Sequence, residues 1–217
     1  MILMSVKEPS LIQPFEKDGN INLYSQWVLE GPGRAYVKDG ALHLDARNTW
    51  GHVLWFIPTI TGDFTLKFTL CIIGEGEQEG HAFIVFFYAQ EAGGSELRLK
   101  GRNGHYPEYH RIRNYSVSFH RGRPPWVSIL RKNPGFRLLT KSHEIHPQLG
   151  RDYHLHIEKS GSRIRFLVDD DVLIDHEDPE RPYDRGKIGL RSFNLFCRVN
   201  DVRLYALHEG GTKRHGA

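Results

Sequence analysis

Hydrophobic and polar residues alternate along most of the chain, and this two-residue period predicts β-strands. Residues 64–70 place two Phe and two Leu side chains on one face, and residues 41–45 alternate in the same way after a Lys-Asp-Gly turn. No stretch of a dozen residues keeps a helical period, and Gly, Pro, Asn and Asp separate the strand-like segments. The pattern therefore predicts a chain that is nearly all β.

Two segments depart from simple alternation. Residues 83–88 are apolar on both faces, which predicts a central strand covered on each side, and their β-branched and aromatic content favours a strand over a buried helical turn. Residues 101–114 are rich in Arg, His and Tyr and show no alternation, so we expect a long excursion from the sheet. Long loops carry function more often than strands do.

Short strands fill the second half of the chain, and turn residues separate them. The predicted turns are residues 122–125, 133–135, 160–161 and 169–171. The predicted strands are residues 115–120, 126–131, 136–141, 153–158, 164–168, 172–175, 187–192 and 199–205.

The last of these strands resemble a known fold. The segments YHLHIEKSGSRIRFLVDDDVLID, RGKIGLRS and VNDVRLYAL are similar to the closing strands of concanavalin A-like jelly rolls, which legume lectins, galectins, laminin G modules and many glycan-cleaving enzymes share. The resemblance implies an all-β, concanavalin A-like jelly-roll β-sandwich of two antiparallel sheets. It covers about the last third of the chain and concerns the fold alone.

A narrower resemblance spans most of the chain. The segments WVLEGPGRAYVKDGALHL, GHYPEYH and LRKNPGFRLL are similar to a bacterial family of unknown function with a galectin-like fold. Some members of that family are encoded beside genes for using rhamnogalacturonan. The family implies no settled activity, so the chemistry must be argued from the residues.

The length of 217 residues suits one domain, and no linker divides it, so we expect a single jelly-roll domain over residues 1–217 with residues 1–15 and 209–217 at its periphery. Uncharged apolar runs are too short to span a bilayer, and charge at residue 7 precedes any signal-peptide core. Cys71 and Cys197 lie in apolar segments typical of buried free thiols. We expect a cytoplasmic protein with no membrane contact, monomeric or homodimeric.

The formal net charge of +3 conceals an uneven distribution. Residues 98–137 hold ten basic residues and one acidic residue, for a charge of +9, whereas the remainder holds 19 basic and 25 acidic residues, for −6. Such a field steers an anionic ligand to one region. An ordinary solvated loop face is the alternative explanation.

The segment 104–114 places acids, bases and anion-binding groups within this basic stretch. Cleavage of a uronate glycan by β-elimination requires neutralising a carboxylate, removing the adjacent proton and protonating the leaving oxygen. We assign proton removal to His110 and protonation to Tyr106 or Tyr109, with Glu108 as a further catalytic candidate. The predicted substrate-binding residues here are Arg111, Arg113, Asn114, Arg131 and Lys132. The sequence thus predicts a polysaccharide lyase whose partner is an acidic poly- or oligosaccharide.

Two other functions stay open. A glycoside hydrolase on a related glycan needs two carboxyl groups, so Glu108 would require a partner from distant sequence. The candidates are Glu30, Glu91, Glu96 and Glu144. A non-catalytic, lectin-like protein needs aromatic platforms and Arg clamps but neither acid nor base.

The segment 50–55 supplies two further candidate substrate-binding residues, His52 and Trp55. If His52 faces the binding sheet, Trp50 shares its face, and an exposed indole is a good platform for a sugar ring. The alternative is a core histidine beside a buried tryptophan, since Trp side chains are largely buried in most proteins.

Signals for other ligands are weaker. His154, His156 and Glu158 share one strand face, but alternation alone explains them as a solvated face. The acidic run 169–171 suits calcium chemically, yet its spacing does not match an EF-hand loop and Asp is common in hairpin turns. The basic stretch carries no nucleic-acid-binding motif. We therefore expect no metal or other cofactor, with calcium as the weaker alternative, and no nucleic-acid partner.

Overall fold

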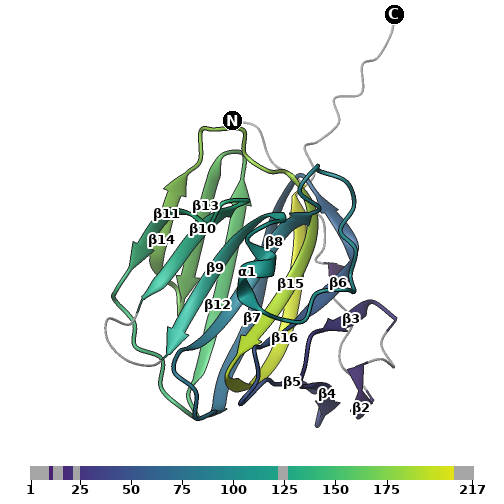
Figure 1. The fold of residues 1–217 in the computed structure, drawn as a ribbon. Helices are drawn as coiled ribbons and strands as arrows, with labels where there is room; N and C mark the ends of the chain where they lie inside the picture. The colour runs from purple at the N-terminus through teal and green to yellow at the C-terminus, as the bar shows by residue number, and fades with distance from the viewer. Residues whose placement is uncertain (1–9, 12–16, 22–24, 122–126, 208–217) are drawn as a thin grey trace, which may run out of the picture.

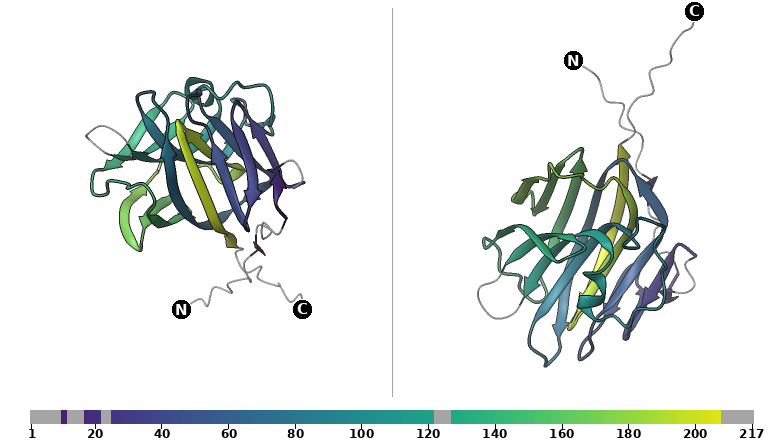
Figure 2. Two further views of the ribbon diagram at one scale, coloured as in Figure 1. Left: turned by 90° about the horizontal axis from the view of Figure 1, so that it is seen from below. Right: turned by 45° about the horizontal axis from the view of Figure 1, so that its top comes forward.

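The computed structural model describes residues 10–11, 17–21, 25–121 and 127–207, which form a sandwich of two antiparallel sheets (Figure 1). In this part of the chain one sheet has nine strands, in the order β14-β13-β12-β7-β16-β5-β4-β2 with β1 paired to β16. The other has seven strands, in the order β11-β10-β9-β8-β15-β6-β3. Figure 2 shows the sheets as two layers. The prediction of an all-β sandwich is confirmed.

The strands of the nine-stranded sheet are β1 (Ser10–Leu11), β2 (Gly19–Asn20), β4 (Arg34–Lys38), β5 (Ala41–Asp45), β7 (Asp63–Glu75), β12 (Asp152–Ser160), β13 (Arg163–Val168), β14 (Asp171–Glu177) and β16 (Leu195–Leu207). Those of the seven-stranded sheet are β3 (Trp27–Glu30), β6 (His52–Thr61), β8 (His81–Gln90), β9 (Arg113–Arg121), β10 (Ser128–Asn133), β11 (Arg137–Ser142) and β15 (Arg185–Phe193). One short helix, α1 (Tyr106–Tyr109), lies between β8 and β9.

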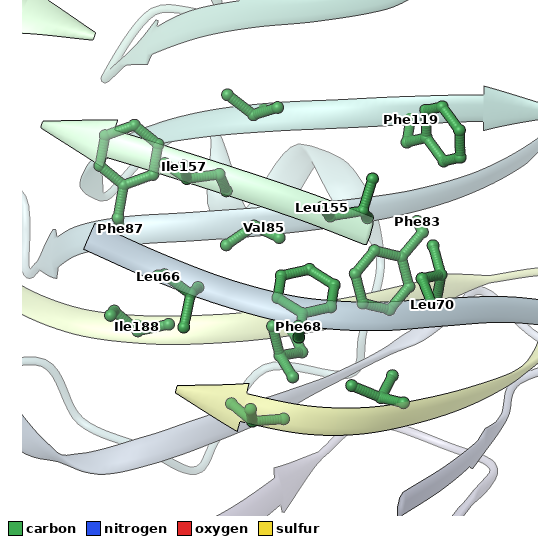
Figure 3. Packing of buried hydrophobic residues seen from close by; sticks show 14 of the residues in the cluster. Leu66, Phe68, Leu70, Phe83, Val85, Phe87, Phe119, Leu155, Ile157 and Ile188 are labelled. Carbon is green, nitrogen blue, oxygen red and sulfur yellow. The ribbon is translucent and has the colours of Figure 1, made fainter. Parts of the chain in front are cut away.

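The main core lies between the sheets and follows the alternation of the sequence. Leu66, Phe68 and Leu70 of β7 face Phe83 and Phe87 of β8 across it (Figure 3). Side chains of the opposite parity on β7 point to solvent or to the outer face of the nine-stranded sheet. The predicted hydrophobic face of residues 64–70 is therefore confirmed.

A second hydrophobic cluster covers the outer face of the seven-stranded sheet. Residues 91–112 leave the sheet after β8 and fold back over it, so that Tyr109 of α1 packs against Trp55 and Phe86. Both faces of β8 are consequently buried, as its uninterrupted apolar pattern predicts. By folding back in this way, residues 91–112 place α1 over the middle of the seven-stranded sheet, in front of β8 and β15 in Figure 1.

Several smaller expectations can also be compared with the structure. The predicted turns at residues 133–135, 160–161 and 169–171 each join two antiparallel strands. The predicted turn at residues 122–125, Trp126 and most of the expected peripheral termini lie outside the described residues. Cys71 and Cys197 are buried free thiols. No helix among the described residues has the length and hydropathy needed to cross a membrane.

Candidate functional site

A buried carboxylate fixes the excursion of residues 91–112 to the edge of the sheet. Glu30, at the end of β3, accepts hydrogen bonds from the Trp55 indole at 2.9 Å and from the backbone and side chain of Arg102 at 3.0 and 2.9 Å. The Tyr109 hydroxyl donates to the same carboxylate at 3.3 Å. These four donors satisfy both oxygens of Glu30, so the excursion is held to the sheet by charge-assisted hydrogen bonds as well as by apolar packing.

Two further contacts fix the start and the end of α1. The Glu108 carboxylate accepts a hydrogen bond from the Asn103 backbone at 2.8 Å. The buried Asn114 amide donates to the backbone oxygens of Tyr109 and Ile112, at 3.0 and 3.1 Å. Glu108, Tyr109 and Asn114 therefore shape the loop, although the sequence had placed them among the groups that contact substrate.

The side chains that this loop presents gather around His110. The rings of Tyr106 and Phe136 have their centroids 4.3 and 3.8 Å from that of His110. The guanidinium of Arg131 lies 3.7 Å from the Phe136 centroid, and that of Arg191 lies 4.9 Å from the Tyr106 centroid. We call these five residues the His110 cluster.

Strand register explains why residues so distant in sequence meet here. Arg131 of β10 pairs with Ser116 of β9, which pairs with Phe86 of β8, and Ile84 of β8 pairs with Arg191 of β15. Side chains two residues apart share a face of a sheet, so Arg131 and Arg191 both project from the outer face. Tyr106, on α1, lies above that face because the excursion folds back over β8.

Arg191 is a buried cation without a carboxylate partner among the described residues. Its side chain is 1% exposed, and one nitrogen donates to the backbone oxygens of Trp50 and Gly104 at 2.7 and 3.0 Å. Burial lowers the pKa of its guanidinium to about 10. Since a buried charge is costly without a counter-ion, an unpaired arginine inside a sheet indicates a role other than stability.

Most other described cations of the basic stretch are neutralised by acids from elsewhere in the chain. Arg102 pairs with Glu30, Arg121 with Glu75, and Lys132 with Asp178. Arg98 and Arg137 have carboxylate partners as well. Arg131 has none among the described residues, and neither do Lys100, Arg111 and Arg113, so the His110 cluster keeps part of the positive charge predicted for the whole stretch.

Burial, aided by this potential, keeps two histidines neutral. Burial, reinforced by the charges of Arg131 and Arg191, lowers the pKa of His110 to about 4, and the same causes lower the pKa of His120 on β9 to about 4. Burial also raises the pKa of Tyr106. At neutral pH the cluster therefore combines neutral imidazole, protonated phenol and two guanidinium ions, a set that attracts an anion and offers it hydrogen-bond donors.

The structure places the other predicted substrate-binding residues outside the cluster. Lys132 points to the opposite face from Arg131, because neighbours in a strand alternate, and its ammonium contacts Asp178 at 2.6 Å. The guanidinium of Arg113 lies 4.4 Å from the Tyr183 ring centroid, and Arg111 is exposed. Among the five basic or amide candidates, Arg131 alone joins Tyr106 and His110 at the cluster.

His52 and Trp55 are fully buried. The His52 imidazole donates to the Pro32 backbone oxygen at 3.0 Å, and burial lowers its pKa to about 4. Trp55 does face the outer side of the sheet, but the excursion of residues 91–112 covers it. Neither ring is therefore available as a sugar platform in this conformation.

Three of the four carboxylates considered as hydrolase partners of Glu108 are occupied by other contacts, and the fourth, Glu144, is exposed. Glu91 pairs with Arg98 and Arg102, and Glu96 pairs with Lys187. Glu30 accepts the four hydrogen bonds described above. Among the described residues, no carboxylate forms an ion pair or hydrogen bond with the side chains of the His110 cluster, so these contacts give a two-carboxyl mechanism no specific support.

The histidine- and aspartate-rich segments make contacts within the protein. His154 shares a hydrogen bond of 3.1 Å with Thr69, and His156 lies 3.2 Å from Glu158. Asp169, in the acidic run, pairs with Arg151 at 2.7 Å. Across the described ranges, His, Cys, Asp and Glu form no group of three or more that could hold a metal ion.

Sequence reasoning missed Arg191 and Phe136. Arg191 follows an apolar stretch near the end of β15, and an arginine in an otherwise buried strand is a signal that could have identified it. Phe136 follows the turn after β10, and only the fold shows that this turn returns to α1. Their proximity to His110 depends on strand order, which one sequence does not display.

Comparison with known proteins supports the fold. The family described as "Domain of unknown function (DUF1961)" matches residues 15–201. A protein of unknown function with a galectin-like fold from Bacillus subtilis is 22% identical, with a TM-score of 0.76 over 93% of this chain and 97% of that one. No curated protein matches the chain.

Two carbohydrate-binding structures share the architecture at lower identity. The carbohydrate binding module CBM66 from Bacillus subtilis is 15% identical, with a TM-score of 0.61 over 83% of this chain and 95% of the module. The exoplasmic/lumenal domain of VIP36, in its Ca²⁺/Man-bound form, is 14% identical, with a TM-score of 0.66 over 94% of both chains. At these identities the likeness establishes the galectin-like jelly-roll fold alone.

Proposed function

This chain belongs to the DUF1961 family, and from that premise we propose that it is a carbohydrate-binding protein whose His110 cluster receives the carboxylate of an acidic sugar unit. The carbohydrate part of the proposal is supported by fold neighbours. One of them is described as a carbohydrate binding module, and another holds mannose. Because a fold hosts many functions, the acidic part must come from the site itself.

One observation carries the acidic part of the proposal, namely that the cluster holds two guanidinium groups and contacts no carboxylate among the described residues. Arg131 is half-buried and within reach of solvent, whereas Arg191 adds its charge from beneath Tyr106. A planar guanidinium binds a carboxylate through two parallel hydrogen bonds, and the aromatic rings beside it suit the apolar face of a sugar. A uronate unit supplies both a carboxylate for the guanidinium and an apolar sugar face for the aromatic rings.

Calorimetric titration with a panel of galacturonic and glucuronic acid oligosaccharides, beside matched neutral oligosaccharides, tests the proposal. We expect at least one uronate series to bind and its neutral counterpart to bind more weakly. Arg131→Gln should lower the uronate affinity about tenfold or more, because a hydrogen bond between charged groups contributes roughly 1.5–3 kcal/mol. Lys100→Gln, which removes an exposed charge from the same basic stretch, should leave the affinity within about twofold.

Salt provides an independent control on the same titration. Raising the ionic strength should weaken uronate binding and leave neutral-sugar binding unchanged, since only the former depends on charge. Equal affinity for the acidic and neutral series, or an unaltered affinity in Arg131→Gln, would exclude the cluster as a carboxylate site. Arg131→Lys, which keeps the charge and loses the planar fork, should show an intermediate affinity.

A second candidate function is cleavage of the same glycan by β-elimination, and one observation favours it. The His110 and Tyr106 rings are in contact beside Arg131, so a neutral base and a protonated acid flank the proposed carboxylate site. A pKa of about 4 makes His110 a weak base in the free protein, whereas a bound carboxylate would raise that pKa toward neutrality. Binding without turnover therefore ranks first.

The two candidates differ in the products that they form. Elimination leaves an unsaturated uronyl group that absorbs in the ultraviolet, and mere binding does not. Incubation of the protein with each uronate oligosaccharide that binds, followed by ultraviolet absorbance, separates them. Growth of that absorbance would establish a lyase, and its absence with every bound oligosaccharide would leave a binding protein.

A further inference from the structure

Trp50 presents an exposed aromatic surface beside the His110 cluster. Its side chain is 60% exposed. The next most exposed Trp or Phe side chain among the described residues is Phe136, at 38%. Phe136 already has Arg131 and His110 within 4 Å of its centroid, so its ring surface is largely occupied. Trp50 contacts the ring of His105 edge-on at 5.2 Å, which leaves indole surface available.

The backbone beneath Trp50 is firmly held. Its carbonyl oxygen accepts the hydrogen bond from Arg191, and the Thr49 hydroxyl fixes the flanking chain by accepting from the Gly51 backbone at 3.0 Å. Gly104 has a positive φ of 89°, and a Cβ there would lie 2.0 Å from the Gly51 oxygen, so the excursion approaches this turn as closely as glycine allows. A platform on such a base meets a ligand with little loss of conformational entropy.

Trp50 and Arg131 lie toward opposite edges of the seven-stranded sheet, on its outer face. Arg131 belongs to β10 and Trp50 lies two residues before the start of β6, so β9, β8 and β15 separate them. Four inter-strand spacings amount to roughly 19 Å, which is longer than one sugar ring. Between the two, the half-buried side chains of His120 and Phe193 flank the same residue of β8, Ala82, on that face.

We propose that Trp50 is a second sugar subsite, so that the ligand is an oligosaccharide that extends across the strands from Arg131 to Trp50. The indole would stack on the apolar face of one ring while Arg131 holds the carboxylate of another. This inference rests on the proposed function and adds a minimum length to its ligand. It also gives Arg191 a place in the site, because that residue contacts Tyr106 at one end and supports Trp50 at the other.

Chain length in the titrations tests the second subsite. With galacturonic and glucuronic acid as monomers and as oligomers of increasing length, the wild-type affinity should rise with length until the ligand reaches Trp50. Trp50→Ala should retain the monomer affinity and lose roughly three- to tenfold in oligomer affinity, and Trp50→Phe should recover much of that loss. Leu149→Ala, which truncates another exposed apolar side chain, serves as the control and should change neither affinity.

The outcomes distinguish this inference from the function on which it rests. If the monomer and the longest oligomer bind equally to the wild type, or if Trp50→Ala weakens both alike, the second subsite is excluded while carboxylate binding stands. If no uronate of any length binds, the proposed function fails and the second subsite fails with it. Quenching of Trp fluorescence by oligomers and not by monomers, lost in Trp50→Phe, would support the subsite directly.

Discussion

At the scale of single residues, the arginine that stability alone does not explain is the most informative. Arg191 lies inside a sheet with its charge unpaired among the described carboxylates, whereas Lys132, another buried cation of the seven-stranded sheet, has Asp178 beside it. Removing one member of a buried ion pair is strongly destabilising, but removing a buried charge that has no partner relieves a desolvation penalty. Removing Arg191 also leaves the backbone oxygens of Trp50 and Gly104 without their donor, so the two effects offset each other. An apolar substitution should therefore destabilise the protein less at Arg191 than at Lys132.

We predict that Arg191→Met lowers the free energy of unfolding by less than Lys132→Met does, because relief of the desolvation penalty offsets the two lost hydrogen bonds, and that it lowers uronate affinity severalfold. Methionine fills a similar volume without the buried charge, and the ligand loses part of the attracting potential. Lys132→Met is the matched control and should lower the free energy of unfolding by about 3 kcal/mol, because the buried Asp178 loses the ammonium at 2.6 Å and keeps only the half-exposed Arg137, at 3.7 Å, as a cation partner. Urea unfolding measures both. A loss of similar size in Arg191→Met would show that Arg191 is retained for stability.

At the scale of elements, the excursion of residues 91–112 turns a sheet face into a site. It covers Trp55 and Phe86 with its own apolar residues and, through α1, brings Tyr106 and His110 over the remaining open area. Glu30 connects this layer to the edge strand β3 through four donors. The site should thus depend on a residue that contacts no ligand.

We predict that Glu30→Gln lowers the free energy of unfolding by about 3 kcal/mol and weakens uronate binding. The amide leaves Arg102 with Glu91, at 3.6 Å, as its remaining carboxylate partner and directs its own N–H groups at other donors. Hydrogen exchange should show faster opening of residues 106–112 than in the wild type. Asp152→Asn breaks an ion pair with Arg198 in which both side chains are exposed, and it should change the stability by less than about 1 kcal/mol. Comparable losses in both variants would contradict the anchoring role of Glu30.

At the scale of the whole molecule, the fold follows from the sequence and much of the site does not. Strict alternation predicts the inner face of β7, and the doubly apolar β8 predicts a covering layer. Alternation also implies that Arg131 and Lys132 cannot both face the ligand, but it does not say which one does. Which of the two faces the ligand depends on strand order and on where the excursion folds back. The same two features determine that Trp55 is covered and that Arg191 contacts Tyr106.

Buried histidines should make the stability of the whole molecule depend on pH. The folded-state pKa values of His52, His110 and His120 are each about 4, below the ordinary value of 6.5, so the folded state binds fewer protons than the unfolded chain. Their contribution is complete above about pH 6.5 and is lost as the pH falls toward about 4. Urea unfolding across this window should show a steadily decreasing free energy of unfolding.

A matched pair of variants tests whether this pH dependence of the free energy of unfolding comes from the buried histidines. His52→Gln should reduce its slope, because one of the three buried rings no longer has to stay neutral, whereas His176→Gln, on β14 and partly exposed, should leave the slope unchanged. A free energy of unfolding that is constant between neutral pH and about pH 4.5 would contradict the assignment of neutral, buried imidazoles.

The most direct test of a carboxylate site on this face is a crystal structure of the protein with the uronate oligosaccharide that binds most tightly. The account predicts a sugar carboxylate within hydrogen-bond distance of the Arg131 guanidinium, on the outer face of the seven-stranded sheet and beside His110. A ligand bound instead on the outer face of the nine-stranded sheet, near His154 and His156, would contradict it.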